Sequence, residues 1–229
     1  RFQSHIGILR GTAIANLDDL VIAMERDVPL YTSDFSYRLQ EPRQEVSHNL
    51  LKLNGHLSGE SGELRFQYGY QNNNRQEFDL RIGDLSKIPA IDLKLNTHTL
   101  DGEWETHHSE SRTFSIGFNT IYQTNRNVPG TQRIPFIPNF NNLSGGAFVT
   151  SKFFINKWTI DAGIRYDYRN YSVKGFDFKN SRYDASFNFN NISASLGITR
   201  QVSANQTLNL NVSTSWRPPH VSELYSVGT

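Results

Sequence analysis

The chain has 229 residues and a formal net charge of +1, with 23 Lys and Arg against 22 Asp and Glu. It has no cysteine, which excludes disulfides, thiolate chemistry and Cys-ligated zinc. The balanced charge argues against a nucleic-acid or acidic partner, because no field of one sign dominates. Apolar residues make up 37% and aromatic residues 12%, which suits alternating strands whose rings supply most of the apolar area.

The first predicted elements are a short strand and a helix. We predict the strand over residues 2–12. No signal peptide precedes it and the chain contains no apolar run of about 18 residues, so we expect a piece of a longer protein. Residues 14–25 are predicted as a short amphipathic helix packed on a loop, with Pro29 beyond its end. Its apolar side chains recur at helical spacing: Leu17, Leu20, Val21 and Met24. No basic face accompanies them, which disfavours binding to a membrane surface.

Eight further strands are predicted along the rest of the chain. Their ranges are 44–57, 63–79, 91–106, 112–125, 145–155, 158–169, 186–201 and 207–217. Most are more than twice as long as the roughly 5–6 residues usual in soluble proteins. The facing of the first is ambiguous around Leu50 and Leu51, and a phase slip near Asn190 and Asn191 indicates a bulge or a rim.

Short turns and long loops alternate between these strands. Short turns are expected near 58–62, 108–111, 156–157 and 203–205, and long loops near 13–43, 80–90, 126–144, 171–185 and after 217. This rhythm is typical of a membrane β-barrel with turns on one side and loops on the other, whereas a sandwich mixes the lengths. The predicted fold is all-β, an antiparallel up-and-down meander of about nine long strands with one short helix in an early loop.

The strand over 158–169 shows the clearest alternation. One face carries Trp158, Ile160, Ala162, Ile164, Tyr166 and Tyr168, and the other carries Thr159, Asp161, Gly163, Arg165, Asp167 and Arg169. A membrane barrel needs one face for lipid and one for a polar lumen, with Trp and Tyr near the interfaces. The pattern therefore favours a transmembrane barrel, and a soluble sandwich or propeller remains the alternative.

The end of the chain carries a more specific signal. After the strand over 207–217, Pro218 and Pro219 stop the ladder because neither can donate a backbone hydrogen bond, and Glu-Leu-Tyr follows at 223–225. This run resembles a signature in the barrel of TonB-dependent outer-membrane receptors, of the Bacteroidetes type. Four earlier segments resemble the same family in the same order: 35–48, 70–79, 135–140 and 163–167.

The resemblance implies an active importer of an iron-siderophore complex, haem, cobalamin or a similar nutrient, energised through TonB. It implies the outer membrane of a Gram-negative bacterium and a 22-stranded barrel around a plug. Residues 1–229 would be part of that barrel domain, without the plug, the TonB box or the C-terminal strands. Its partners would be the plug, TonB through that plug, membrane lipid and a small-molecule chelate, with no nucleic acid. Two open sheet edges would also make an isolated piece self-associate.

Candidate site residues follow from this arrangement. The predicted ligand-binding candidates lie near the long loops, where cations and rings together suit an anionic chelate: Arg126, Arg133, Phe136, Phe140, His220 and Tyr225. The predicted lumen-facing or plug-facing candidates are Arg75, Glu77, Arg165, Asp167 and Arg217. Packing is the alternative for His220 and Tyr225, and a structural ion pair is the alternative for Arg75 and Glu77. His107 and His108 adjoin a short turn and are not expected to bind metal or haem.

Catalysis has no support in the sequence. No triad-like spacing of hydroxyl, His and carboxylate occurs, nor any Gly-rich phosphate loop, so neither an enzyme nor a bound cofactor is expected. Two other functions remain open from the residues alone. One is a passive porin or structural barrel of the outer membrane, and the other is a soluble β-rich binding domain.

Overall fold

The computed structural model describes residues 2–5, 17–25, 27, 35, 37, 39, 41–81, 83–106, 111–177 and 179–225. The predictions for residues 6–12, for the start of the helix at 14–16 and for His107 and His108 lie outside these ranges. The chain divides into two compact units. Unit 1 comprises 1–48, 73–94 and 127–133, and unit 2 comprises 49–72, 95–126 and 134–229.

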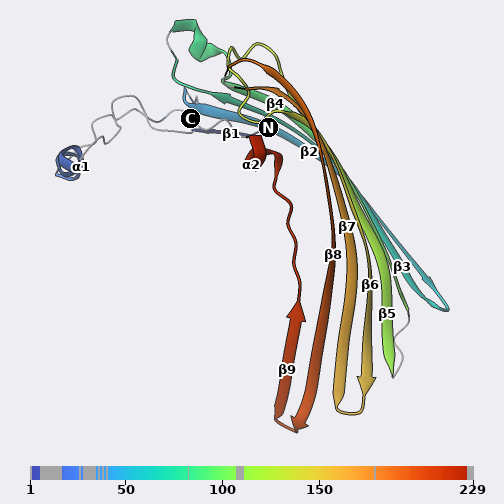
Figure 1. The fold of residues 1–229 in the computed structure, drawn as a ribbon. Helices are drawn as coiled ribbons and strands as arrows, with labels where there is room; N and C mark the ends of the chain where they lie inside the picture. The colour runs from blue at the N-terminus through green and yellow to red at the C-terminus, as the bar shows by residue number, and fades with distance from the viewer. Residues whose placement is uncertain are drawn as a thin grey trace. The chain divides into compact units, whose positions relative to one another are not determined.

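Strand neighbours follow chain order from β1 to β9 (Figure 1). The elements are β1 Phe2–His5, α1 Leu17–Met24, β2 Arg43–Gly59, β3 Gly62–Phe78, the 3-10 helix η1 Gly83–Lys87, β4 Ile91–Thr106, β5 Arg112–Asn127, β6 Asn139–Ile155, β7 Trp158–Phe176, β8 Arg182–Ser203, β9 Gln206–Ser213 and α2 Val221–Tyr225. Pairing from β5 through β9 is antiparallel. The predicted antiparallel meander of about nine strands is therefore confirmed. Within the described ranges, no helix is long and apolar enough to cross a membrane.

The loop predicted near 171–185 is wrong. β7 continues to Phe176 and β8 begins at Arg182, so only residues 177–181 connect them. The Asp177 carboxylate accepts the backbone N–H groups of Lys179 at 2.9 Å and Ser181 at 2.8 Å, which closes the turn. Apolar alternation fades in these strand ends, because Lys174 and Asp184 form a cross-strand ion pair at 3.0 Å instead. Periodicity detects a strand only where one face is apolar.

The bounds of the last strand also differ from the prediction. β9 ends at Ser213, so Trp216 and Arg217 lie beyond it. Thr214 still donates its N–H to the carbonyl oxygen of Ala194, and its hydroxyl accepts the N–H of Ala194, both at 2.9 Å. The side chain thus closes the ladder before the two prolines. β6 begins at Asn139, earlier than the predicted residue 145. The bulge predicted near Asn190 is wrong, since the β7–β8 register is continuous there and the irregularity lies between Gln201 and Ser203.

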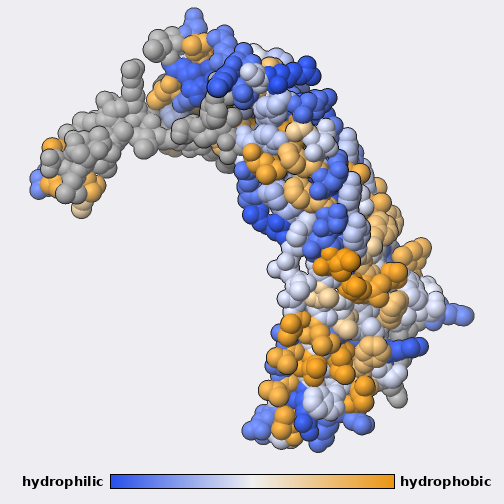
Figure 2. Space-filling model, viewed as in Figure 1, coloured by the Kyte–Doolittle hydropathy of each residue, from blue (hydrophilic) through white to orange (hydrophobic). Residues whose placement is uncertain are grey.

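The sheet of unit 2 has an apolar face, defined by cross-strand rows of hydrophobic residues. The rows pair Ile160 with Ile198, Ala162 with Leu196, Ile164 with Ala194, Leu196 with Val212 and Ile198 with Leu210. Figure 2 shows hydrophobic residues gathering over the lower parts of β8 and β9, near their short turn. Leu208, Leu210 and Val212 are 64%, 62% and 65% exposed. This face therefore lacks a second protein layer over β9 in the described part of the chain.

The opposite face, called the polar face below, is defined by rows of polar and small residues. Gly163 pairs with Thr150 and Ser195, Arg165 with Phe148 and Ser193, and Asp167 with Gly146 and Asn191. The alternation predicted for β7 therefore separates two different surfaces in the structure.

Gly117 leaves room for the ring of Phe148 next to the backbone of β5. A Cβ at this position would lie 2.5 Å from Phe148 Cζ and 2.8 Å from the carbonyl oxygen of Gly102. We expect Gly117→Ala to lower the free energy of unfolding by about 1–3 kcal/mol, since a carbonyl oxygen cannot rotate away. Urea titration of the refolded protein measures this. Gly145→Ala is the matched control, because its Cβ would meet nothing nearer than 3.4 Å. Equal midpoints for the two variants would contradict the steric argument.

Candidate functional site

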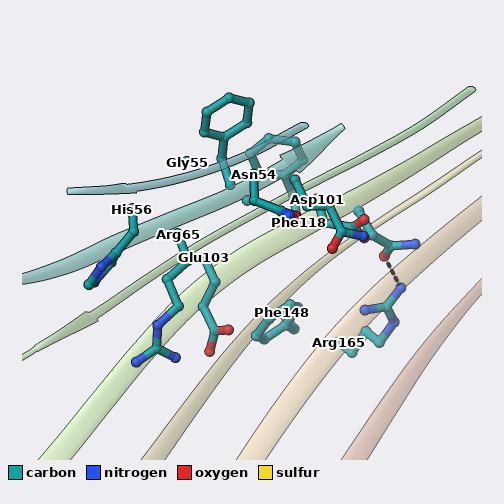
Figure 3. A pocket seen from close by; sticks show the side chains of 13 residues that line it. Asn54, Gly55, His56, Arg65, Asp101, Glu103, Phe118, Phe148 and Arg165 are labelled. Carbon is teal, nitrogen blue, oxygen red and sulfur yellow. Dashed lines mark hydrogen bonds between the residues drawn. The ribbon is translucent and has the colours of Figure 1, made fainter. Parts of the chain in front are cut away.

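A groove of about 680 Å³ lies across β2 to β7 in unit 2. Its polar and charged lining residues come from successive strands: Asn54, His56, Arg65, Gln67, Asp101, Glu103, Asn119 and Arg165. In Figure 3, side chains from β3, β4, β6 and β7 extend into this groove: Arg65, Glu103, Phe148 and Arg165. Period-two alternation explains the arrangement, since every second residue of each strand reaches the same face.

Among the described cations of the groove, Arg165 makes the most hydrogen bonds. Its Nε donates to both carboxylate oxygens of Asp167 at 2.8 Å, and its Nη2 donates to Asp167 Oδ1 at 2.6 Å and to Asn119 Oδ1. The guanidinium lies 5.9 Å from the ring centroid of Phe148. Gly146 leaves room for this pair, because a Cβ there would lie 2.2 Å from Arg165 Nη2. The predicted candidates Arg165 and Asp167 are thus brought together as an ion pair.

Two further ion pairs lie on β3. Arg65 donates to Glu63 at 2.9 Å within unit 2. Arg75 and Glu77, the other predicted pair, form an ion pair with each other in unit 1. Surface pairs of this kind contribute little to stability. Their main effect is to neutralise charge on the surface of β3.

A second site forms where α2 packs on the first residues of β6 and the last residues of β7. Its fully or almost fully buried residues, here called the α2 cluster, are Phe140, Tyr171, Val173 and Val221. The ring of Tyr225 stacks on that of Tyr183 with centroids 5.0 Å apart. The ring of His220 meets Phe140 edge to face at 6.0 Å. Three of the six predicted ligand-binding candidates, Phe140, His220 and Tyr225, therefore meet here.

Within residues 214–225, called the α2 segment below, one carboxylate joins two other residues of the segment. Glu223 accepts hydrogen bonds from both terminal nitrogens of Arg217 at 3.0 Å and from the backbone N–H of His220 at 2.7 Å. These bonds, first that from Arg217 and then that from His220, lower the pKa of the Glu223 carboxyl. Arg217, a predicted lumen-facing candidate, has a side chain that is 73% exposed and paired with Glu223.

His220 is held in one tautomer. The backbone N–H of Ser222 lies 3.2 Å from His220 Nδ1 and donates to it, so Nδ1 must accept and the neutral ring carries its proton on Nε2. Burial lowers the pKa of His220, the positive charge of Arg169 lowers it further, and Glu223 partly opposes both. The imidazole is therefore held toward its neutral form, with Nε2–H as a donor.

The other predicted ligand-binding candidates have different surroundings. Arg126 donates to the carbonyl oxygens of Asn125 at 2.8 Å and Phe140 at 2.9 Å. Because Asn125 is the register partner of Phe140, Arg126 lies on the opposite face of the sheet from the Phe140 side chain. Arg133 pairs with Asp79 at 3.1 Å in unit 1. Phe136 is exposed.

The sequence does not single out Arg169 as a candidate site residue, although the alternation of β7 predicts that it lies on the polar face. Its Nη1 donates to the hydroxyl of Tyr171 at 3.2 Å, and its guanidinium lies 5.7 Å from the Tyr171 ring centroid. The available signal was the alternation Arg165, Asp167, Arg169, in which one carboxylate faces two guanidinium groups. In the part of the chain that is described, no three His, Cys, Asp or Glu side chains gather closely enough to hold a metal ion.

Comparisons with known proteins bear on this architecture. The family model described as TonB dependent receptor-like, beta-barrel matches residues 9–229. No curated protein matches the sequence. Among solved structures, the unliganded ferric citrate transporter FecA matches with a TM-score of 0.56 at 12% identity, over 75% of this chain and 27% of that chain. The FrpB iron transporter from Neisseria meningitidis matches at 0.55 and 15%, over 81% and 32%. The copper transporter OprC matches at 0.55 and 15%, over 80% and 32%.

At these identities the solved structures show a shared fold. The chain spans about a third or less of the length of the proteins it matches. The match of the family model, in contrast, extends over most of the sequence, and the antiparallel meander agrees with it. This chain belongs to the TonB-dependent receptor-like β-barrel family.

Proposed function

We propose that residues 1–229 form part of the barrel wall of an outer-membrane transporter that imports a metal chelate or a similar scarce nutrient, with energy delivered through TonB. Membership of the receptor family supports this proposal. The solved structures that share the fold include a ferric citrate transporter and a copper transporter. A chelated metal ion is therefore the cargo class to test first.

The sheet of unit 2 has one apolar face and one polar face, and this difference supports the membrane part of the proposal. On β7 the apolar face extends from Trp158 to Tyr168, about 33 Å along the strand at roughly 3.3 Å per residue. At the strand tilt of roughly 35–45° found in membrane barrels, this band is about 25 Å high, which matches their apolar belt. The aromatic residues at its two ends suit the membrane interfaces.

The polar face supports the transport part. Its groove is lined by paired cations and by the carboxylates of Asp101 and Glu103, a surface that requires water or another polar partner. In the proposed transporter, this partner is a plug domain inside the barrel. The ion pair of Arg165 with Asp167 would then stabilise the wall that the plug contacts.

Energy-dependent uptake tests the proposal. The complete gene product that contains this chain is expressed in a Gram-negative strain lacking its own ferric citrate receptor, with or without TonB. Iron-55 is supplied as ferric citrate or as ferrioxamine B, and copper-64 as a chelate. We expect accumulation of at least one of these only in cells with TonB. Equal uptake without TonB would indicate passive conduction, and no uptake of any probe would contradict a metal-chelate transporter.

A further inference from the structure

We propose that Arg169 and His220 form an anion-binding subsite on the polar face, which selects a negatively charged, carboxylate-bearing cargo. The assignment rests on the proposed function for what the cargo is, and on the geometry of the α2 segment for where it binds.

Charge balance along β7 singles out Arg169. Arg165, Asp167 and Arg169 occupy alternate positions and therefore share the polar face. Both oxygens of Asp167 are taken by Arg165. Among the described residues, no carboxylate lies within ion-pair distance of Arg169, whose one side-chain partner is the hydroxyl of Tyr171. One positive charge is left over at this position.

The surroundings of Arg169 would strengthen its attraction for an anion. Its register partners are Ser144, which is buried, and Phe189, whose ring packs on Phe187. Arg169 is itself half-buried beside these rings, which reduces its contact with water, so the local dielectric is lower and a charge-assisted hydrogen bond is stronger than at an open surface. A planar guanidinium also presents two parallel donors, which fit a carboxylate.

His220 supplies the second donor. The hydrogen bond from Ser222 to Nδ1 leaves Nε2–H without a partner among the described residues. Arg169 and His220 both border the α2 cluster, since Arg169 donates to the hydroxyl of Tyr171, and the ring of Phe140 meets the rings of both Tyr171 and His220. The positive charges of Arg169 and Arg217 lower the pKa of His220, and the charge of Glu223 raises it. An oxyanion bound to Arg169 would offset the two cations that disfavour imidazolium. We therefore expect the pKa of His220 to rise on binding, and affinity to increase as pH falls from neutral through the ordinary range of histidine.

Equilibrium binding to the complete receptor, purified in detergent, tests the assignment. The probes are iron-55 ferric citrate, which is anionic, and iron-55 ferrioxamine B, which is cationic. The wild-type protein should bind ferric citrate more tightly. Arg169→Gln should weaken that binding by about 10- to 100-fold, the typical effect of losing a hydrogen bond between charged groups. Arg169→Lys should recover part of the loss, because the charge remains while the fork is lost.

Arg182→Gln is the matched control. Arg182 lies at the same end of the sheet, but its place in the β7–β8 register puts it on the face opposite Arg169, so affinity should not change. His220→Gln should remove the increase in affinity at lower pH while the protein stays folded, as judged by its heat-dependent electrophoretic mobility. A structural role of Arg169 alone would affect both probes equally.

Three outcomes would overturn the subsite: no binding of ferric citrate to the wild-type protein, tighter binding of ferrioxamine B, or unchanged binding by Arg169→Gln. The proposed function can be refuted independently of the subsite. Charge-selective binding with uptake that does not need TonB would refute the transporter mechanism and leave the subsite. TonB-dependent uptake without charge selectivity would refute the subsite and leave the transporter.

Discussion

Val221→Asp is expected to release the α2 segment from the sheet. Val221 is 0% exposed and lies within the α2 cluster with Phe140, Tyr171 and Val173. A carboxylate there would be buried among apolar side chains, a situation that costs about 3–5 kcal/mol. Detachment avoids that cost. Hydrogen exchange followed by mass spectrometry should show amide protection lost in peptides covering residues 214–225 and retained in β6 and β7.

Leu224→Asp is the control for this substitution. Leu224 lies on the same short helix and is 40% exposed, so a carboxylate at this position can stay hydrated. Protection of the α2 segment should change little. Similar losses in the two variants would show that the helix is held by its backbone or by the Arg217–Glu223 pair, and not by the burial of Val221.

Ile164→Arg is expected to destabilise the protein in a bilayer by about 2–4 kcal/mol, the cost of a cation on the lipid face of a barrel near the midplane. Ile164 lies near the middle of the apolar row on β7, with Ala194 as its register partner. It is 55% exposed, so steric crowding does not account for the expected loss. Urea titration of the complete protein folded into lipid vesicles measures the change in free energy.

Ser195→Arg separates the two faces in that experiment. Ser195 pairs with Gly163 in the register, one residue along β7 from Ile164, and faces the polar side. A cation there has Gly163 and Ser213 as register partners and points away from the apolar face, and we expect a change below about 1 kcal/mol. Equal losses for Ile164→Arg and Ser195→Arg would contradict the assignment of the apolar face to lipid.

The strands inside the apolar band could be predicted from the sequence. β4 has the predicted bounds, because loop and turn residues flank it in the sequence. The central part of β7 alternates without interruption. Failures concentrate where the strands leave this band. Lys174 and Asp184 continue the ladder as an ion pair, and hydrophobic periodicity cannot detect a strand segment that both faces expose to polar surroundings.

The candidate site was predicted in part. The chemistry of Phe140, His220 and Tyr225 suggested a ligand, and the structure brings them together around Val221, a residue with no distinguishing sequence signal. Their roles in binding stay predictions, as does the Bacteroidetes-type subgroup. Arg126 and Arg169 could not be separated by sequence, since only the register shows that Arg126 faces away from the Phe140 side chain while Arg169 lies on the same face as that side chain.

Because β9 ends early, it limits where the outer surface of the membrane can lie on the proposed barrel. β8 continues to Arg182, but its pairing with β9 stops at Ser195, and Thr214 satisfies only Ala194 beyond that point. Hydrocarbon cannot solvate a free N–H or C=O group. Unless another strand covers this edge of β8, the outer surface of the bilayer must therefore lie close to the level of Tyr166 and Tyr168, whose register partners are Ile192 and Asn190. In the proposed barrel, the wall above that level would stand in water.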